Sequence, residues 1–201
     1  MNAARGSRLL RGVRMRTILG GLLASLLLLG SLPSHANTLE VVAMAPDHVG
    51  MTVRKSPVLY FYISDATKYL FLFTLDSRRG PLLFEAPLPS PTHSGFWPIR
   101  LEDYHVELEE GIQYRWYVSV SAHDLAPLAG GTIERVNPRD VNYQGRGCDQ
   151  DSFLQAEKAG VWYDALACLN ELIEANPQDP SFRRMRSALL KDVGIILPTA
   201  N

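Results

Sequence analysis

A turn and a long β-strand are encoded in Leu108-Glu109-Glu110-Gly111-Ile112-Gln113-Tyr114-Arg115-Trp116-Tyr117-Val118-Ser119-Val120. Tyr114, Trp116, Val118 and Val120 recur at every second position, so they share one face of that strand. The spacing of Leu108, Gly111 and Tyr114 is typical of a tyrosine corner, in which a strand-opening tyrosine bonds to upstream backbone in a β-sandwich. We therefore predict that the rest of the chain is arranged around this strand.

Short apolar runs separated by turn residues continue in both directions from this strand, over residues 37–138. Proline, glycine, aspartate and serine bound the runs, and no helical period separates them. Pro87, Pro89 and Pro91 are predicted to end one run, and Gly130-Gly131 to form a bulge in another. About seven strands result: 39–45 with an extension at 52–53, 58–63, 69–76, 82–86, 96–101, the strand after Gly111, and 128–136.

This pattern predicts a mainly β fold with an α appendage. Its β part is expected to be an antiparallel sandwich of the fibronectin type III or immunoglobulin-like kind. The run at 58–63 is apolar on both faces, which favours a central position in its sheet. Because the disulfide between sheets and the core tryptophan of antibody domains are absent, we favour the fibronectin-like variant.

A linker at 139–148 precedes a segment, 149–201, in which apolar residues recur with the 3.6-residue period of helices. Three helices are expected, divided at Gly160 and at Asn176-Pro177, with Asp179 capping the third. The segment is similar to the middle and end of a tetratricopeptide unit. A single unit cannot bury its own apolar stripe. We therefore expect the helices to pack on the sandwich or on a partner.

Residues 1–36 have the composition of a signal peptide. Five arginines precede an apolar run at 18–29, and Ser34-His35-Ala36 forms a small-x-small cleavage site. An uncleaved anchor is the alternative, but the run is shorter than the roughly 20 residues of a spanning helix. Met15 is a second candidate start. We expect cleavage after Ala36 and a periplasmic or secreted protein.

The part of the chain that follows the signal peptide is acidic. The signal peptide holds five of the 20 basic residues and none of the 21 acidic ones, which leaves a net charge of −6. Nucleic acid and anionic lipid both attract an excess of basic groups. We therefore expect no nucleic-acid binding, and no membrane association after cleavage. The sequence does not predict an oligomeric state.

Two cysteines, Cys148 and Cys168, lie in the helical part of the chain. An even number of cysteines in an oxidising compartment favours a disulfide. Helix geometry argues against a disulfide, because two helices that turn at Gly160 would place the cysteines at different positions along the helix axes. A bridge then requires the chain before Asp151 to fold back. Both possibilities stay open, and a bridge would act as a structural clip.

Several motifs together resemble a secreted bacterial family known as domain of unknown function 928. The resemblance spans nearly the whole exported chain. It implies export and a sandwich followed by helices, but no activity and no functional residues. The motifs are Ala45-Pro46-Asp47-His48-Val49-Gly50, Leu59-Tyr60-Phe61-Tyr62, Leu108-x-x-Gly111-x-x-Tyr114-Arg115-Trp116, Ala129-Gly130-Gly131-x-Ile133-Glu134-Arg135-Val136 and Gly160-x-Trp162-Tyr163-Asp164-Ala165-Leu166.

No sequence motif indicates catalysis or metal binding. No G-x-S-x-G nucleophile elbow is present. Acidic residues cluster at 102–110, but neighbours on one turn rarely face each other across a cleft as glycoside hydrolysis requires. Asp47-His48 and His123-Asp124 fit exposed turns better than metal sites. We predict no catalytic, cofactor-binding or metal-binding residue. The four histidines outside the signal peptide, none in a ligand spacing, are His48, His93, His105 and His123.

Most aromatic residues of the expected strands fit core packing. Phe96-Trp97-Pro98 and Tyr143 lie beside expected loops, where a ring is able to stack on a sugar or a peptide. Trp97 and Tyr143 are therefore the speculative ligand contacts.

Three functions are compatible with these features. The first is a non-catalytic interaction or adaptor module that binds another envelope protein through the helical segment. The second is a carbohydrate or cell-wall binding module that uses Trp97. The third is a hydrolase with carboxylates assembled in space. The first rests on analogy with binding scaffolds, and we favour it.

Overall fold

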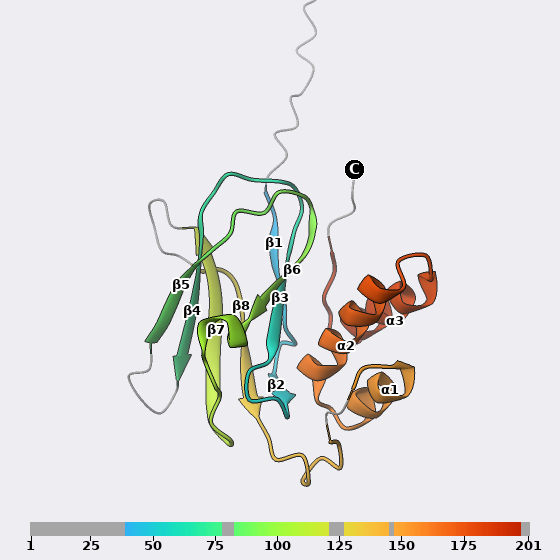
Figure 1. Ribbon diagram of the computed structural model, residues 1–201. Helices are drawn as coiled ribbons and strands as arrows, with labels where there is room; N and C mark the ends of the chain where they lie inside the picture. Colours follow the sequence, from blue (N-terminus) through green and yellow to red (C-terminus); the bar gives the residue numbers. More distant parts are fainter. Residues whose placement is uncertain (1–38, 78–82, 121–126, 145–146, 198–201) are drawn as a thin grey trace, which may run out of the picture. The chain divides into compact units, whose positions relative to one another are not determined.

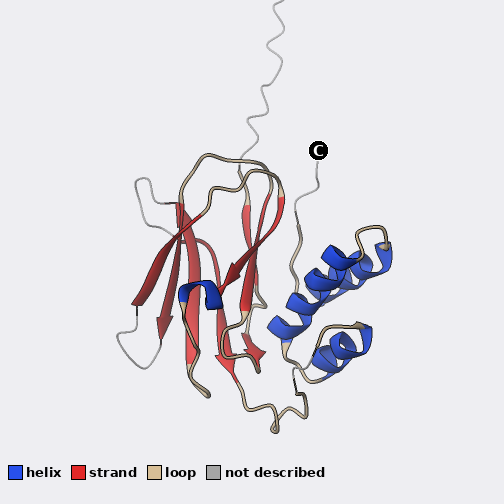
Figure 2. Ribbon diagram, viewed as in Figure 1, coloured by secondary structure: helices blue, strands red, loops and turns tan. Residues whose placement is uncertain are grey.

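Two β-sheets and three helices make up the described part of this chain, whose structure is a computed structural model (Figures 1 and 2). The structure describes residues 39–77, 83–120, 127–144 and 147–197. The predicted signal peptide, with its cleavage site at Ala36, lies outside these residues. None of the described helices is long and apolar enough to span a membrane.

The smaller sheet has three antiparallel strands, in the order β1 (Val41–Met44), β3 (Val58–Ile63) and β6 (Gly95–Arg100). The larger sheet has five strands, in the order β2 (Val49–Thr52), β8 (Pro127–Arg135), β7 (Gln113–Val120), β4 (Phe71–Ser77) and β5 (Leu83–Leu88). β2 runs parallel to β8, and the other pairs are antiparallel. The prediction of a mainly β fold is confirmed.

β7 is the central strand of the larger sheet, and its inner face contributes to the core. Tyr114, Trp116 and Val118 are buried on that face, as their alternation predicts. The backbone N–H of Glu109 donates a hydrogen bond of 3.1 Å to the phenol oxygen of Tyr114. Gly111 has a φ of +72°, a left-handed conformation that suits glycine. The turn therefore ties the start of β7 to the segment before it.

The described residues form three layers, because the helices cover the outer face of the smaller sheet (Figure 1). Phe61 on β3 and Phe71 on β4 bring the two sheets together, with ring centroids 6.0 Å apart. On the outer face, the guanidinium of Arg186 lies 3.6 Å from the ring centroid of Phe96. β3 is buried along its whole length because it has a neighbouring layer on each face.

The three helices are α1 (Gln150–Lys158), α2 (Trp162–Ala175) and α3 (Pro180–Asp192). Asp149 caps α1 by accepting from Ser152 N at 2.7 Å, and Asp179 caps α3 by accepting from Ser181 N at 2.8 Å. Ten of the 14 residues of α2 are buried, because it lies between the other two helices and strands β2 and β3, which belong to different sheets. The apolar stripe of α2 is therefore covered by strands of both sheets.

Three expectations about the strands were wrong. The described residues contain eight strands, because Pro46-Asp47 divides the first run and β2 crosses to the larger sheet. β5 continues through Pro87, since a proline is tolerated on an edge strand. The irregularity in the β7–β8 pair lies at Val118/Ser119, and Gly130-Gly131 pairs in register.

Candidate functional site

The side chain of Tyr163, near the start of α2, reaches the buried interior of the sheets. The indole N–H of Trp116 donates a hydrogen bond of 2.9 Å to the Tyr163 hydroxyl, which donates to Thr132 O at 3.2 Å. Burial raises the pKa of Tyr163 well above its ordinary value, so the phenol stays protonated. The hydroxyl group of Tyr163 therefore both accepts and donates a hydrogen bond inside the fold.

Two glycines leave the space that Tyr163 occupies. A Cβ on Gly50 would lie 2.5 Å from the Cε2 atom of Tyr163. A Cβ on Gly131 would lie 2.3 Å from the Cβ of Ala45 and 3.2 Å from the Tyr163 hydroxyl. Both separations to carbon are shorter than any normal contact. The Gly-Gly pair in β8 is thus explained by close packing and not by a bulge.

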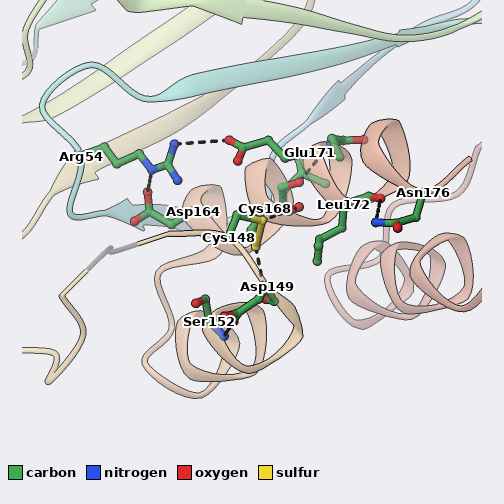
Figure 3. The surroundings of a disulfide bond; sticks show 11 residues. Arg54, Cys148, Asp149, Ser152, Asp164, Cys168, Glu171, Leu172 and Asn176 are labelled. Atoms are coloured by element: carbon green, nitrogen blue, oxygen red, sulfur yellow. Dashed lines mark hydrogen bonds and ion pairs between the residues drawn. A yellow bond between two sulfur atoms is a disulfide. The ribbon is translucent and has the colours of Figure 1, made fainter.

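Asp164, the next residue of α2, fastens the helix to the end of β2. Its carboxylate accepts hydrogen bonds from Thr52 Oγ1 at 3.0 Å and from Val53 N at 2.8 Å. Arg54 Nε lies 3.3 Å from the same carboxylate, and Arg54 Nη1 lies 3.6 Å from Glu171 (Figure 3). Burial raises the pKa of Asp164 to about 6, against the lowering effect of these three donors.

A disulfide joins Cys148, before α1, to Cys168 on α2 (Figure 3). The two Cα atoms lie 5.3 Å apart, within the usual range for a bridge. The stagger expected from two straight helices does not arise, because the chain before α1 is not helical and folds back: Asp149 has an extended backbone. Gly147, with a φ of +69°, allows the chain to turn just before the cysteine. The bridge holds the start of the helical layer against α2.

These contacts define a helix–sheet joint, formed by Thr52, Arg54, Trp116, Tyr163 and Asp164. Four of the five motifs that resemble a known family contribute to it or to the glycines that make room for Tyr163. The Asp164 side chain is completely shielded from solvent. A substrate therefore has no access to this carboxylate, and the joint is a structural feature.

A polar groove of about 610 Å³ lies at the surface beside the joint, lined by Arg54, Lys55, Ser56, Glu102, His105 and Glu107. It brings together two members of the acidic cluster at 102–110. Lys55 Nζ lies 3.6 Å from Glu107 Oε2, and these two side chains are 63% and 65% exposed. A carboxylate so well solvated lacks the enclosed environment that makes a general acid.

An apolar depression lies at the open side of the two sheets, where β5 and β6 are both edge strands. It has a volume of about 210 Å³ and is called the Trp97 slot here. The half-buried ring of Trp97 is held by its indole N–H, which donates to His93 O at 3.2 Å. The His93 ring lies 4.8 Å from the Trp97 ring. The lining residues are Phe61, Leu88, Pro89, Trp97 and Pro98.

The two speculative ligand contacts have different surroundings. Trp97 lines the slot and is half-buried. Tyr143 is 3% exposed and packs in the core, so its ring is not available for stacking and that expectation was wrong. Sequence reasoning missed Tyr69 and Leu70, which are 55% and 62% exposed. They precede β4 as an apolar pair, which was assigned to the strand itself.

The described histidines do not come together in a metal site. His48 Nδ1 lies 3.1 Å from Asp47 Oδ1 on the exposed surface. The His123-Asp124 pair lies outside the described residues. Within residues 39–77, 83–120, 127–144 and 147–197, no three His, Cys, Asp or Glu side chains come close enough together to hold a metal ion.

Comparison with known proteins identifies one family. The family model described as Domain of Unknown Function (DUF928) matches residues 30–197, which include both sheets and all three helices. No curated protein matches the chain. The match covers well over half of the sequence, and the resemblance seen in the motifs is confirmed. The chain is therefore a member of the DUF928 family.

Proposed function

We propose that this chain is an exported, non-catalytic protein-binding module whose partner docks at the Trp97 slot. The observation that carries the proposal is an apolar depression at the open side of the sheets, which Trp97 lines. The helical layer has a structural role in this proposal, because the apolar stripe of α2 is already buried against β2 and β3. The partner surface is therefore on the sheets and not on the helical stripe.

The strand order supports a fibronectin-like scaffold. β1, β3 and β6 correspond to strands A, B and E of an immunoglobulin-type sandwich, and β4, β7 and β8 correspond to C, F and G. Tyr114 opens the strand that corresponds to F and has the tyrosine-corner hydrogen bond. Sandwiches of this kind present loops and edges as binding surfaces on a rigid frame.

Two exposed apolar residues lie in the loop that leads into β4, the strand that pairs with β5 beside the slot. The N–H of Thr67 donates to Pro91 O at 2.9 Å, which holds the β3–β4 loop beside the β5–β6 loop. Tyr69 and Leu70 follow in that loop, just before Phe71, which pairs with Leu88 at the slot. Exposed apolar side chains that adjoin a concave apolar site are typical of protein interaction surfaces.

The chemistry of the lining favours a protein side chain over a sugar. A sugar ring stacks on an aromatic face but also needs hydrogen-bond partners for its hydroxyls, and the slot is lined by three aliphatic and two aromatic side chains. Its volume of about 210 Å³ is below the roughly 300–1,000 Å³ of small-molecule sites. One inserted apolar side chain fits both the size and the polarity.

A partner is not expected to bind here by pairing a strand of its own with the edge of either sheet. β6 carries Pro98 opposite Tyr60, and β5 carries Pro87 opposite Leu72. A proline on an edge strand removes a backbone donor and discourages pairing with another strand. The partner is therefore expected to insert a side chain and not to extend a sheet.

The proposal is tested by photo-crosslinking in intact cells, with a photoreactive phenylalanine analogue at position 97. We expect one discrete protein adduct, lost when Leu70 is changed to Asp. The matched control carries the same analogue at Tyr117, a partly exposed aromatic of β7, and should give no such adduct. Identical products at both positions, or binding of cell-wall oligosaccharides that is abolished by Trp97→Ala, would contradict the proposal.

A further inference from the structure

The exposed side of α3 carries a concentration of positive charge. Its sequence contains Arg183, Arg184, Arg186 and Lys191 and one acidic residue, Asp192, at the last position. Arg183, Arg184 and Lys191 are exposed. At about 100° per residue they fall within an arc of roughly 100°, and they span about 12 Å along the axis. These three residues are called the α3 basic face.

No described acidic side chain forms an ion pair with the α3 basic face, whereas Arg54, Arg115 and Arg135 each have a carboxylate partner. At the start of the helix, Asp179 accepts from Ser181 N, and the hydrogen bonds from Ser181 and the charge of Arg184 together lower the pKa of Asp179. The positive charge of α3 therefore contrasts with the acidic character of the chain as a whole after residue 36.

Arg186 adds a fixed charge next to this face. Its guanidinium lies over the Phe96 ring and donates to Asn170 Oδ1, so it is held in place on the inner side of α3. Burial and the nearby charge of Arg183 lower the pKa of Arg186 to about 10. Arg183 and Arg186 therefore repel each other, and a bound anion would relieve that repulsion.

We propose that the α3 basic face binds an acidic segment of a protein partner, through carboxylates that pair with Arg183, Arg184 and Lys191. Guanidinium groups match carboxylates in planar, two-pronged hydrogen bonds, and two of the three residues are arginines. The spacing along α3 suits successive acidic side chains of a short peptide. This surface lies on the helical layer and does not depend on the Trp97 slot.

Other polyanions fit the surface less well. Three exposed cations are few for duplex DNA, where binding proteins make roughly 6–10 phosphate contacts. An anionic membrane would attract these three cations, but it would repel the acidic remainder of the chain. A short acidic peptide contacts only the basic face and avoids that repulsion.

The inference is tested by fluorescence anisotropy with a labelled hexaglutamate peptide and the purified protein at low salt. We expect saturable binding that weakens as salt is raised. Substitution of Arg183, Arg184 and Lys191 by Glu should weaken it about tenfold or more. The matched control substitutes Lys68, Arg139 and Lys158, three exposed cations elsewhere, by Glu. That control makes the same change in net charge and should alter affinity less than about twofold.

Several outcomes would overturn the inference. Absence of hexaglutamate binding at low salt is one, and equal losses in the two triple variants are another. Tighter binding to phosphatidylserine vesicles, duplex DNA or polygalacturonate through the same three residues would assign the face to a different polyanion. Salt-sensitive self-association lost in the α3 variant would assign it to a second copy of the chain. Trp97→Ala should leave hexaglutamate affinity unchanged, which separates this test from that of the slot.

Discussion

The helix–sheet joint and the Trp97 slot both place aromatic rings beside strands, but they differ in how completely those rings are enclosed. At the joint, Tyr163 is buried, its hydroxyl has two partners, and glycines leave it just enough room. At the slot, Trp97 is half-buried, and a cavity of about 210 Å³ remains beside it. Enclosure of the first kind stabilises the fold, whereas the open cavity of the second leaves surface for a partner.

The comparison implies that changes at the joint reduce stability and that changes at the slot reduce binding. The family motifs alone do not identify a binding surface, because four of the five contribute to the joint or to the glycines beside Tyr163. Solvent accessibility separates the joint from the slot, because the Asp164 side chain is fully enclosed, whereas Trp97 lines an open depression. The following predictions test that division, beginning with the largest expected effect.

Tyr163→Ala should destabilise the protein by about 3–5 kcal/mol, because it removes a buried aromatic ring and leaves the Trp116 indole N–H without a partner. Tyr163→Phe should cost about 1–2 kcal/mol, since only the hydroxyl is lost. Urea unfolding followed by tryptophan fluorescence measures both. If the two substitutions have the same small effect, the joint is not the tightly packed element described here.

Loss of the disulfide should have the next largest effect. The bridge closes a loop of 20 residues in sequence separation, and releasing such a loop lowers the free energy of unfolding by about 3 kcal/mol. Urea unfolding of the Cys148→Ser/Cys168→Ser double variant and of the oxidised wild-type protein gives the difference in the free energy of unfolding. The reduced wild-type protein serves as a second comparison. A double variant as stable as the oxidised protein would contradict a stabilising role.

Asp164 should make stability depend on pH in the direction opposite to most carboxylates. Its pKa in the folded protein is about 6, above the ordinary value of 3.8. The folded state therefore binds the proton more tightly than the unfolded state does. The resulting gain in the free energy of unfolding is fully present below about pH 4 and is lost as the pH rises through 6. A pKa difference of roughly two units between the folded and unfolded states corresponds to about 3 kcal/mol in the free energy of unfolding.

The measurement compares urea unfolding of wild type and Asp164→Asn between pH 4 and 7. The wild-type protein should gain stability relative to the variant as the pH falls. Asp179→Asn is the control, because its pKa is lowered by the hydrogen bonds from Ser181 and its contribution has the opposite sign. Equal pH profiles for wild type and Asp164→Asn would contradict the raised pKa.

The sequence predicts local features well, since they depend on residues close together in the chain. The alternation in β7, the caps Asp149 and Asp179, and the Tyr114 hydrogen bond all follow from short spacings. The parallel pairing of β2 with β8 and the Thr52–Asp164 contact, 112 residues apart, have no local signature. The cysteine pairing depended on whether the chain before α1 folds back, and that path has no helical or strand period to reveal it.

The candidate site was predictable only in part, for the same reason. Trp97 was predicted as a speculative ligand contact from its place beside an expected loop, and it lines the slot, but the slot also needs Phe61 and Leu88 from other strands. Tyr143 occupies a similar place in the sequence and is nevertheless buried, because the chain before α1 folds back onto the core. Exposure of a loop aromatic is a tertiary property that neighbouring residues do not encode.

Trp97→Ala should have the smallest effect on stability and the largest on partner binding. The ring is half-buried, and its indole N–H bonds to an exposed backbone carbonyl, so truncation should cost about 1 kcal/mol or less. Removal of the same ring takes away one wall of the slot, so affinity for a partner identified by crosslinking should fall at least tenfold. Unfolding and binding measured on one preparation give both values. A loss of several kcal/mol in stability with unchanged binding would reassign Trp97 to the core and remove the difference between the two regions.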